Sequence, residues 1–299
     1  MKIIVYFFFI FLSYLNAQMK DYAIKPNNLK VKTYMNIKIL DAKEIHFPDK
    51  NNLAFTEISD LAYKNKKLFA VGDKGVLYIM GILIDKDTIT KLKLISAARL
   101  KDESGKKLRK KYRDSEGLVF VDDKLAISFE GKERIDLYDF NGVKIKNLQI
   151  HKKLKNEKDY QGNNKGLEAV AFSKKYGIIT APEKPLKNKK IRTVYAKDKV
   201  WKFKAEGSIS GMEFISKNKL LILFRDFSYV TRERITTLVE LNLKNSQTKV
   251  IVKMDSYKGW KLDNFEGLTR VEKNKFLMMS DDNDSLFQKT LLVLFEIVD

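Results

Sequence analysis

The chain has 299 residues, no cysteine and a formal net charge of +20. That length suits one large β domain or two smaller ones, and the missing cysteines exclude disulfides, a thiol nucleophile and a cysteine-ligated metal. The charge invites a nucleic-acid interpretation, but basic residues are spread over turns and no helix-turn-helix, zinc-finger or RNP-like motif is present. We therefore expect no nucleic-acid partner and favour phosphate-rich ligands or anionic membrane surfaces.

Residues 1–17 are predicted to be a Sec-type signal peptide. Lys2 would be the only charge of a short, positively charged n-region. The apolar run from Ile3 to Leu15 is too short to span a bilayer comfortably. Ala17 offers a small residue for cleavage, although Leu15 stands where a small residue is usual. We expect a periplasmic or secreted protein with no transmembrane span after cleavage; an uncleaved anchor is the alternative.

Residues 18–54 are predicted to hold a polar leader followed by a strand. Positions 19–28 are mostly polar, whereas positions 29–47 are rich in β-forming residues. Residues 55–299 are predicted to form the main domain, because one cassette recurs in them. Each copy opens with a short motif, continues as two strands around a tight turn, and ends in a polar residue. The opening motifs are Ser59-Asp60, Glu116-Gly117, Leu167-Glu168, Ser210-Gly211 and Glu266-Gly267.

The spacing of the cassettes predicts an all-β fold, a single β-propeller with five blades. A period of roughly 40–50 residues carrying about four strands is typical of propeller blades. The clearest blade, from Glu116 onward, includes an Asn141-Gly142 turn between alternating strands, which is a strong hairpin signal. The last blade has only three strands, so we expect the segment 29–47 to pair with its open edge and close the ring. If that segment formed much of a further blade, the count would be six.

Two long insertions interrupt the repeats, at residues 100–114 and 151–165. The first carries seven Lys or Arg, among them Arg109 and Arg113. It is either a solvated connection or a basic loop that leans over one mouth of the propeller.

The fold would gather acidic residues at that mouth, since the first strand of a blade begins where the second ends. We expect the ring to contain Asp60, Asp73, Glu116, Glu130, Glu168, Glu183, Glu266, Asp281 and Asp282. Carboxylates so close together would repel one another. They could bind a hard cation such as Ca²⁺, share protons as acid/base pairs, or serve as structural ties to Lys, Arg and backbone N–H groups.

The motifs resemble the family described as having esterase-like activity of phytase, over roughly residues 55–298. The matching segments are Asp114-Ser115-Glu116-Gly117, Asn164-Lys165-Gly166-Leu167-Glu168, Ser210-Gly211-Met212, Asn264-Phe265-Glu266-Gly267-Leu268, and Ser280-Asp281-Asp282-Asn283 with Gln288 and Thr290. The chain departs from the family at Asp60, where Gly is usual, and at Phe224-Arg225, where a Glu-Arg pair is usual. The resemblance implies hydrolysis of phosphoric or other esters with Ca²⁺.

These observations assign expected roles to twelve residues. We expect Glu116, Glu168 and Glu266 to be catalytic. Calcium ligands would come from Asp73, Glu130, Glu183, Asp281 and Asp282, and the substrate would contact Arg109, Arg113, Lys165 and Arg225. The expected ligand is anionic, either a phosphate-bearing small molecule or an envelope component, and the protein is expected to be a monomer. The alternative is a non-catalytic propeller that binds a protein or glycan, with structural carboxylates.

Overall fold

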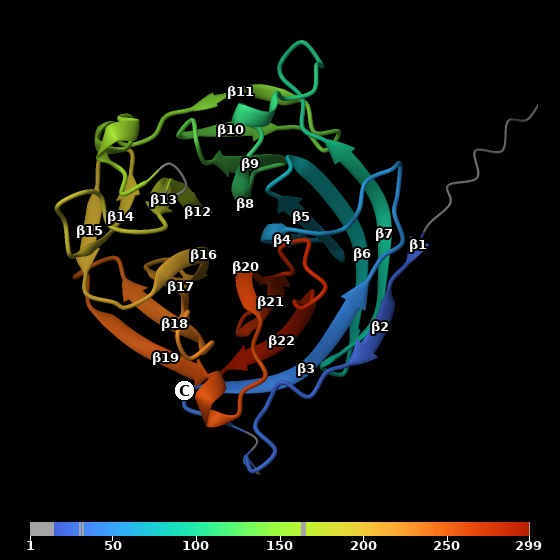
Figure 1. Cartoon of the computed structure of the whole chain (residues 1–299). Helices are drawn as coiled ribbons and strands as arrows, with labels where there is room; N and C mark the ends of the chain where they lie inside the picture. Colours follow the sequence, from blue (N-terminus) through green and yellow to red (C-terminus); the bar gives the residue numbers. More distant parts are fainter. Residues whose placement is uncertain (1–14, 30, 32, 163–165, 299) are drawn as a thin grey trace, which may run out of the picture.

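Five antiparallel sheets surround a common axis in the computed structural model (Figure 1). The structure describes residues 15–29, 31, 33–162 and 166–298. The chain is therefore a five-bladed β-propeller, as predicted, and the alternative of six blades is wrong. Most of the predicted signal peptide, residues 1–14, lies outside the described residues.

The blades follow one another along the chain. Blade 1 contains β4 (Ile58–Lys64), β5 (Lys67–Gly72), β6 (Val76–Asp85) and β7 (Thr88–Arg99). Blade 2 contains β8 (Ser115–Val121), β9 (Lys124–Phe129), β10 (Arg134–Tyr138) and β11 (Lys144–Leu148). Blade 3 contains β12 (Leu167–Ser173), β13 (Gly177–Pro182), β14 (Arg192–Ala196) and β15 (Val200–Phe203). Blade 4 contains β16 (Ser208–Ser216), β17 (Lys219–Phe227), β18 (Arg234–Asn242) and β19 (Thr248–Asp255).

Blade 5 joins the two ends of the chain. It contains β20 (Asn264–Arg270), β21 (Lys275–Asp281), β22 (Leu291–Ile297) and the N-terminal strands β3 (Ile37–His46) and β2 (Gln18–Asp21). Strand β3 runs antiparallel to β22, with Leu291 opposite Glu44 and Ile297 opposite Ile37. This pairing confirms that an N-terminal strand closes the ring.

The outermost N-terminal segment extends the closure to a second blade. Strand β2 pairs with β3, while β1 (Leu15–Asn16) pairs with β7 of blade 1. The start of the segment expected to be a polar leader, positions 19–28, therefore belongs to a strand. Strand β2 is largely exposed and is held by backbone pairing to an open edge, so its sequence carries no buried alternation to reveal it.

Five buried apolar clusters fill the five interfaces between neighbouring blades of the described chain. Representative pairs in these clusters are Leu61 and Leu277 between blades 1 and 5, Val71 and Leu118 between blades 1 and 2, Ala126 and Val170 between blades 2 and 3, Ala181 and Met212 between blades 3 and 4, and Leu223 and Phe265 between blades 4 and 5. The core is thus a ring of side chains between the sheets, which fixes the blades around the axis.

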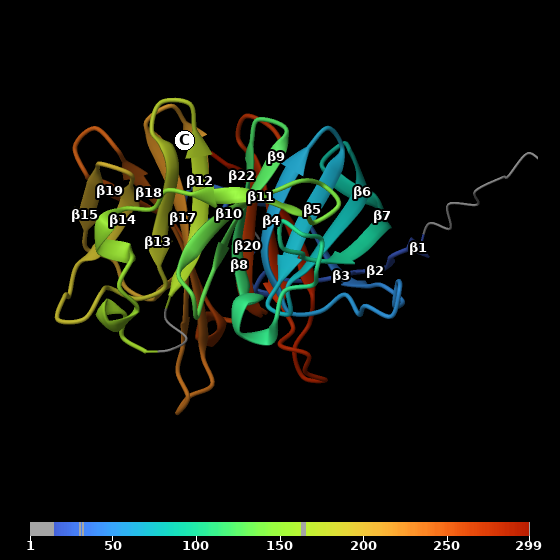
Figure 2. The same cartoon turned by 90° about the horizontal axis from the view of Figure 1, so that it is seen from above.

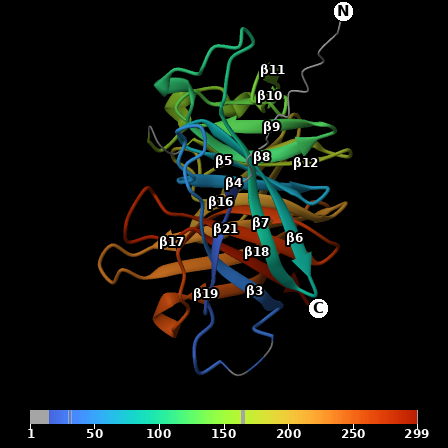
Figure 3. The same ribbon diagram turned by 90° about the vertical axis from the view of Figure 1, so that its right-hand side faces the viewer.

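The longer connections lie on one face, which we call the mouth face. It is the face where the innermost strands β4, β8, β12, β16 and β20 begin. Figure 2 shows these connections along its lower edge and tight turns along its upper edge, and Figure 3 shows the same arrangement from the side. Within the described residues, four short 3₁₀ helices occur in the connections: η1 (Lys110–Tyr112), η2 (Lys152–Leu154), η3 (Glu157–Asp159) and η4 (Ser256–Lys258). None of the described helices is long and apolar enough to cross a membrane.

Candidate functional site

A β-bulge near the start of every innermost strand directs one side chain toward the axis at the mouth face. The pairing of each first strand with the second shifts register directly after Ile58, Ser115, Leu167, Ile209 and Phe265. A bulge leaves an extra residue unpaired and re-aims its side chain. The residues at these bulges are Ser59, Glu116, Glu168, Ser210 and Glu266.

The three glutamates predicted to be catalytic lie together. One carboxylate oxygen from each of Glu116, Glu168 and Glu266 lies within 4.8 Å of the others. All three side chains are buried, with residue exposures of 9%, 4% and 5%. The repeat pattern therefore located this cluster correctly.

Arg225 partly neutralises the cluster. Its Nη2 donates to Oε1 of Glu168 at 3.1 Å, and its Nη1 donates to Oε1 of Glu266 and to Oδ1 of Asn264. Burial opposes the charged form of Arg225, but the neighbouring glutamates, Glu266 first, raise its pKa above the ordinary value. The guanidinium is therefore charged, and it bridges blades 3, 4 and 5.

Glu116 lacks such a partner. Glu266 also accepts a hydrogen bond from Asn264 Nδ2 at 2.7 Å, whereas no donor from the described part of the chain reaches Glu116. Burial, and then the charges of Glu168 and Asp73, raise the pKa of Glu116 well above its usual value. Glu116 is thus a buried acid that would either hold a proton or need a cation that the described residues do not supply.

The pKa values of the other two glutamates are also raised, but the charge of Arg225 opposes the rise in both. Burial raises the pKa of Glu168 well above its usual value, and the charge of Arg225 opposes the rise. Burial raises the pKa of Glu266 to about 7, again against the opposing charge of Arg225. Groups with a pKa near neutrality can take up and release protons under physiological conditions.

Glu116 also belongs to a second cluster of carboxylates. Oxygens of Asp73, Asp114 and Glu116 lie within 4.8 Å of one another at the junction of blades 1 and 2. Ser59 donates a 2.6 Å hydrogen bond to Asp73 Oδ1. Burial, with Asp114 nearby, raises the pKa of Asp73 to about 6 despite this bond.

The remaining predicted calcium ligands do not join these groups. Glu130 accepts a hydrogen bond from the backbone N–H of Gly166 at 2.5 Å. Asp282 accepts from Thr56 Oγ1, from the N–H of Glu57 and from Thr290 Oγ1. Both carboxylates therefore serve as ties between neighbouring segments.

Asp281 and Glu183 lie beside the cluster. Asp281 Oδ1 accepts from the N–H of Asn283 at 2.7 Å, and burial together with Glu266 raises the pKa of Asp281 to about 9. Glu183 Oε1 lies 4.0 Å from Nη2 of Arg225. Both residues therefore belong to the expected carboxylate ring. Glu183 directly follows β13 and Asp281 is the last residue of β21.

Asp60 is not at the mouth, so its place in the expected ring is wrong. Its side chain is fully buried among the innermost strands, where Oδ1 accepts from the N–H groups of Leu61 and Leu268 and Oδ2 accepts from the N–H of Leu118. The cause is a one-residue offset, because Ser59 occupies the bulge in blade 1 that Glu116 occupies in blade 2.

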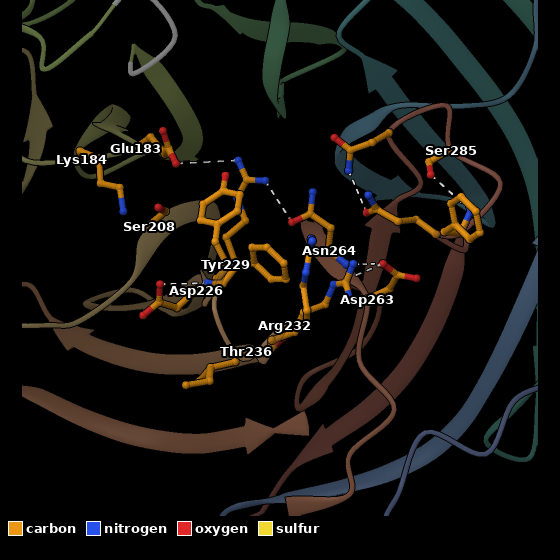
Figure 4. A pocket seen from close by; sticks show the side chains of 17 residues that line it. Glu183, Lys184, Ser208, Asp226, Tyr229, Arg232, Thr236, Asp263, Asn264 and Ser285 are labelled. Carbon is orange, nitrogen blue, oxygen red and sulfur yellow. Dashed lines mark hydrogen bonds and ion pairs between the residues drawn. The ribbon is translucent and has the colours of Figure 1, made fainter. Parts of the chain in front are cut away.

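A cavity of about 770 Å³ opens beside Arg225, between blades 3, 4 and 5 (Figure 4). Arg225 and Asn264 line it and also contact the buried glutamates. Further cations in its wall are Lys184, Arg232 and Arg234, and acids are Glu183, Asp226 and Asp263. Tyr229 and Phe287 also line the cavity. The cavity is thus a mixed site, polar and apolar in equal measure, which suits an anionic ligand with a less polar part.

The predicted substrate-binding cations are dispersed. Arg225 lies in the cavity wall, whereas Arg109 and Arg113 do not line it. Arg109 is exposed, and the turn around residues 102–106 projects from the rim of the ring (Figure 1). Arg113 lies beside Asp114 and opposes the rise that burial causes in the pKa of Asp114. Lys165 lies outside the described residues.

Sequence reasoning missed several residues of the site. Asp114 and Asn264 each stand two positions before a bulge glutamate and belong to motifs that were recognised, so this shared offset could have identified them. Glu133 accepts the N–H of Leu167 at 2.8 Å, and a Cβ at Gly166 would collide with its carboxylate. Arg232 comes from the connection between β17 and β18, and Arg234 is the first residue of β18. No sequence signal marked either residue.

Comparisons with known proteins gave one family and several distant structures. The model of the phytase-like family, described as esterase-like activity of phytase, matches residues 53–284. Comparison with curated proteins found no match. Among solved structures, the glutaminyl cyclase of Myxococcus xanthus has 11% identity and a TM-score of 0.48, with 88% of this chain and 97% of that chain covered. A chain of the mitotic checkpoint complex has 8% identity and a TM-score of 0.40, with 86% and 69% covered.

Proposed function

Because the chain belongs to the phytase-like family described as having esterase-like activity of phytase, we propose that it is an exported hydrolase of phosphoric esters, with other esters as the wider substrate class. The proposed site is the mouth of the propeller, with Ca²⁺ as cofactor. The observation that carries the proposal is the convergence of Glu116, Glu168 and Glu266 beside Arg225. Export rests on the predicted signal in residues 1–17.

The residues present fit a calcium ion. Ca²⁺ prefers carboxylate and other oxygen ligands, and Asp73, Asp114 and Glu116 bring three such groups together. Glu116 has no donor from the described chain, so a cation would satisfy a buried acid that is otherwise unpaired. These three residues would hold the ion. When bound, Ca²⁺ supplies Lewis-acid polarisation of a phosphoryl oxygen and lowers the pKa of a bound water.

The remaining residues divide the work of binding and proton transfer. Arg225 presents one edge to the cavity and is held by Glu168 and Glu266, so it can meet a phosphate oxygen in a fixed orientation. Glu266, whose pKa burial raises to about 7, can accept a proton from an attacking water or return one to a leaving oxygen. Lys184 and Arg232 supply further positive charge in the cavity wall.

The test is thermal unfolding of residues 18–299 with Ca²⁺ and with EDTA, followed by a screen of phosphoric esters. A ligand at about 100 times its Kd stabilises the native state by roughly 2.7 kcal/mol, so we expect a clear rise in Tm with Ca²⁺. Phosphate release should require Ca²⁺ and be lost in Glu266→Gln. The absence of both a Tm shift and phosphate release would contradict the proposal.

One observation favours a second function, a non-catalytic propeller that binds a protein or glycan at the same mouth. Several acids of the expected ring act as ties, since Asp60, Glu130 and Asp282 accept backbone N–H groups. If every ring carboxylate were structural, Glu116→Gln, Glu168→Gln and Glu266→Gln would alter folding or partner binding while no ester was hydrolysed. The Ca²⁺ response separates the two functions, because a purely structural ring predicts none.

A further inference from the structure

Two loops on the mouth face end in apolar side chains that are almost completely exposed. The loop between β17 and β18 (residues 228–233) carries Tyr229 and Val230, with exposures of 82% and 93%. The loop between β21 and β22 (residues 282–290) carries Leu286 and Phe287, with exposures of 101% and 95%. Figure 2 shows both loops projecting at the lower edge of the molecule, and Figure 3 shows them on the same side.

The loops hold these side chains outward by hydrogen bonds of their own. In loop 228–233, Arg232 N–H donates to the carbonyl of Ser228 at 2.8 Å, and Ser228 N–H donates to the carbonyl of Glu233 at 3.0 Å. In loop 282–290, Asp284 N–H donates to Asp282 Oδ1 at 3.1 Å and Asn283 Nδ2 donates to Gln288 Oε1 at 3.0 Å. The apolar tips are therefore set by ordered turns, and they do not fold back onto the blades.

Exposed cations lie on the same face as the tips, together with two exposed acids, Asp226 and Asp284. The neighbouring segment 184–191 contains Lys184, Lys187, Lys189 and Lys190 and no acidic residue. Lys187, Lys189 and Lys190 are exposed, and this segment projects from the same face (Figure 2). Arg232 is exposed within loop 228–233, and the whole chain carries a net charge of +20. Apolar tips beside exposed cations match the layered chemistry of an anionic bilayer surface.

A small ligand in the cavity would not cover the whole apolar surface. Tyr229 and Phe287 line the cavity, but Val230 and Leu286 do not. The two tips belong to different blades and both border the cavity, whereas a contiguous apolar patch would be expected for a typical protein interface. A bilayer accepts separate apolar tips because each one enters the acyl boundary independently.

We propose that the mouth face docks on anionic phospholipid membranes, with Tyr229, Val230, Leu286 and Phe287 inserted at the level of the acyl boundary and the lysines of segment 184–191 among the headgroup phosphates. Docking of this kind places the opening of the cavity at the headgroup layer. The inference does not depend on ester hydrolysis, so a failure of either idea leaves the other standing.

The test is co-sedimentation of the protein, purified after export, with vesicles of phosphatidylcholine alone or mixed with phosphatidylglycerol. We expect binding to the anionic vesicles that weakens at high salt. The double variant Val230→Ser/Leu286→Ser should bind about tenfold less tightly or worse, yet hydrolyse a soluble ester like the parent protein. The matched control is Leu83→Ser, because Leu83 is an apolar side chain that is 45% exposed. It lies near the end of β6 that is farther from the mouth face.

A second measurement reports insertion directly. Both native tryptophans, Trp201 and Trp260, are buried, so a tryptophan introduced by Leu286→Trp would dominate any change on lipid binding. Its emission should shift to the blue with anionic vesicles and be quenched by brominated acyl chains. Equal sedimentation of Val230→Ser/Leu286→Ser and Leu83→Ser, absence of vesicle binding, or an unshifted emission would overturn the proposal.

Discussion

Nη2 of Arg225 lies 3.1 Å from Oε1 of Glu168, so a guanidinium from blade 4 neutralises a buried carboxylate from blade 3. In the other four blades the position equivalent to Arg225, at or directly after the end of the second strand, is Asp or Glu. In the same blade, Ser210 takes the bulge position that glutamates occupy in blades 2, 3 and 5. Blade 4 therefore supplies a cation where its neighbours supply anions, which explains how three buried glutamates can share one mouth.

Removing this cation should destabilise the fold in a pH-dependent way. Arg225→Met leaves Glu168 and Glu266 without their main partner. Removing one partner of a buried ion pair lowers the free energy of unfolding by about 3–5 kcal/mol. The loss should be smaller at pH 5 than at pH 8, because protonated glutamates need no cation. Urea unfolding at both pH values measures the difference.

The matched control for this change is Lys219→Met. Lys219 pairs with Glu240 at 2.9 Å, but its own side chain is 48% exposed, and pairs at the surface contribute about 0–1 kcal/mol. If Arg225→Met cost no more than Lys219→Met at pH 8, Arg225 would not be what stabilises the cluster.

The wild-type protein without Ca²⁺ should lose stability as the pH rises. Burial raises the pKa of Glu130, Glu133 and Glu266 to about 7 and that of Asp73 to about 6. A folded-state pKa above the unfolded value means that the folded protein binds the proton more tightly. The associated stability is complete below about pH 4 and is lost as the pH rises through 6 to 7.

One pKa unit corresponds to about 1.4 kcal/mol, so the free energy of unfolding in EDTA should fall by about 3 kcal/mol or more between pH 5 and pH 8. Denaturant unfolding at a series of pH values measures it. Saturating Ca²⁺ should flatten the profile, since a bound cation favours the ionised acids. A stability that increases from pH 5 to pH 8 in EDTA would contradict the burial of these acids.

Glu116→Gln should separate stability from cation binding. The change removes a buried acid that no described donor reaches, so in EDTA at pH 8 the variant should be more stable than the parent by on the order of 1 kcal/mol. The Tm rise caused by Ca²⁺ should be lost at the same time. Calorimetric titration with Ca²⁺ and thermal unfolding measure the two effects, with Glu206→Gln as the control because that side chain is 93% exposed. A Ca²⁺ response that survives in Glu116→Gln would place the ion elsewhere.

The sequence was informative wherever a repeat set the geometry. The five cassettes predicted the five blades. The last blade lacked a strand, which predicted that the N-terminal segment would pair with it, because an unpaired strand edge at the ring closure would be unfavourable. The same repeats located Glu116, Glu168 and Glu266, since equivalent positions in a propeller meet at the axis. These were consequences of symmetry and needed no knowledge of individual contacts.

The sequence was less informative where function depends on a departure from the repeat. Arg225 was recognised as replacing a carboxylate, but its bonds to Glu168 and Glu266 depend on which direction one long side chain takes between blades. Part of the cavity wall comes from loops 228–233 and 282–290, whose sequences carry no periodic signal. The strand pairing of β2 was hidden for a similar reason, because backbone bonds at an exposed edge leave no apolar pattern.

Asp60 provides the sharpest test of which acids are structural. At the equivalent position the other blades carry Gly117, Ala169, Gly211 and Gly267. A Cβ at Gly117 would lie 2.7 Å from the backbone nitrogen of Val170, and one at Gly267 would lie 2.8 Å from Leu61 Cγ. The innermost strands therefore approach one another closely at this level, and only blade 1 places an acidic side chain there.

That side chain accepts three backbone hydrogen bonds, from Leu61, Leu118 and Leu268, and so ties blades 1, 2 and 5 together. Asp60→Gly would leave the N–H groups of Leu118 and Leu268 buried without this acceptor, and each unsatisfied buried group costs about 1–3 kcal/mol. Removing a buried acid offsets part of the loss, so we expect a net destabilisation of about 2–4 kcal/mol. The loss should be the same with Ca²⁺ and with EDTA, because Asp60 belongs to neither acidic group at the mouth. Urea unfolding of Asp60→Gly in both conditions decides the point: a loss that appeared only with Ca²⁺ would make Asp60 part of the cation site.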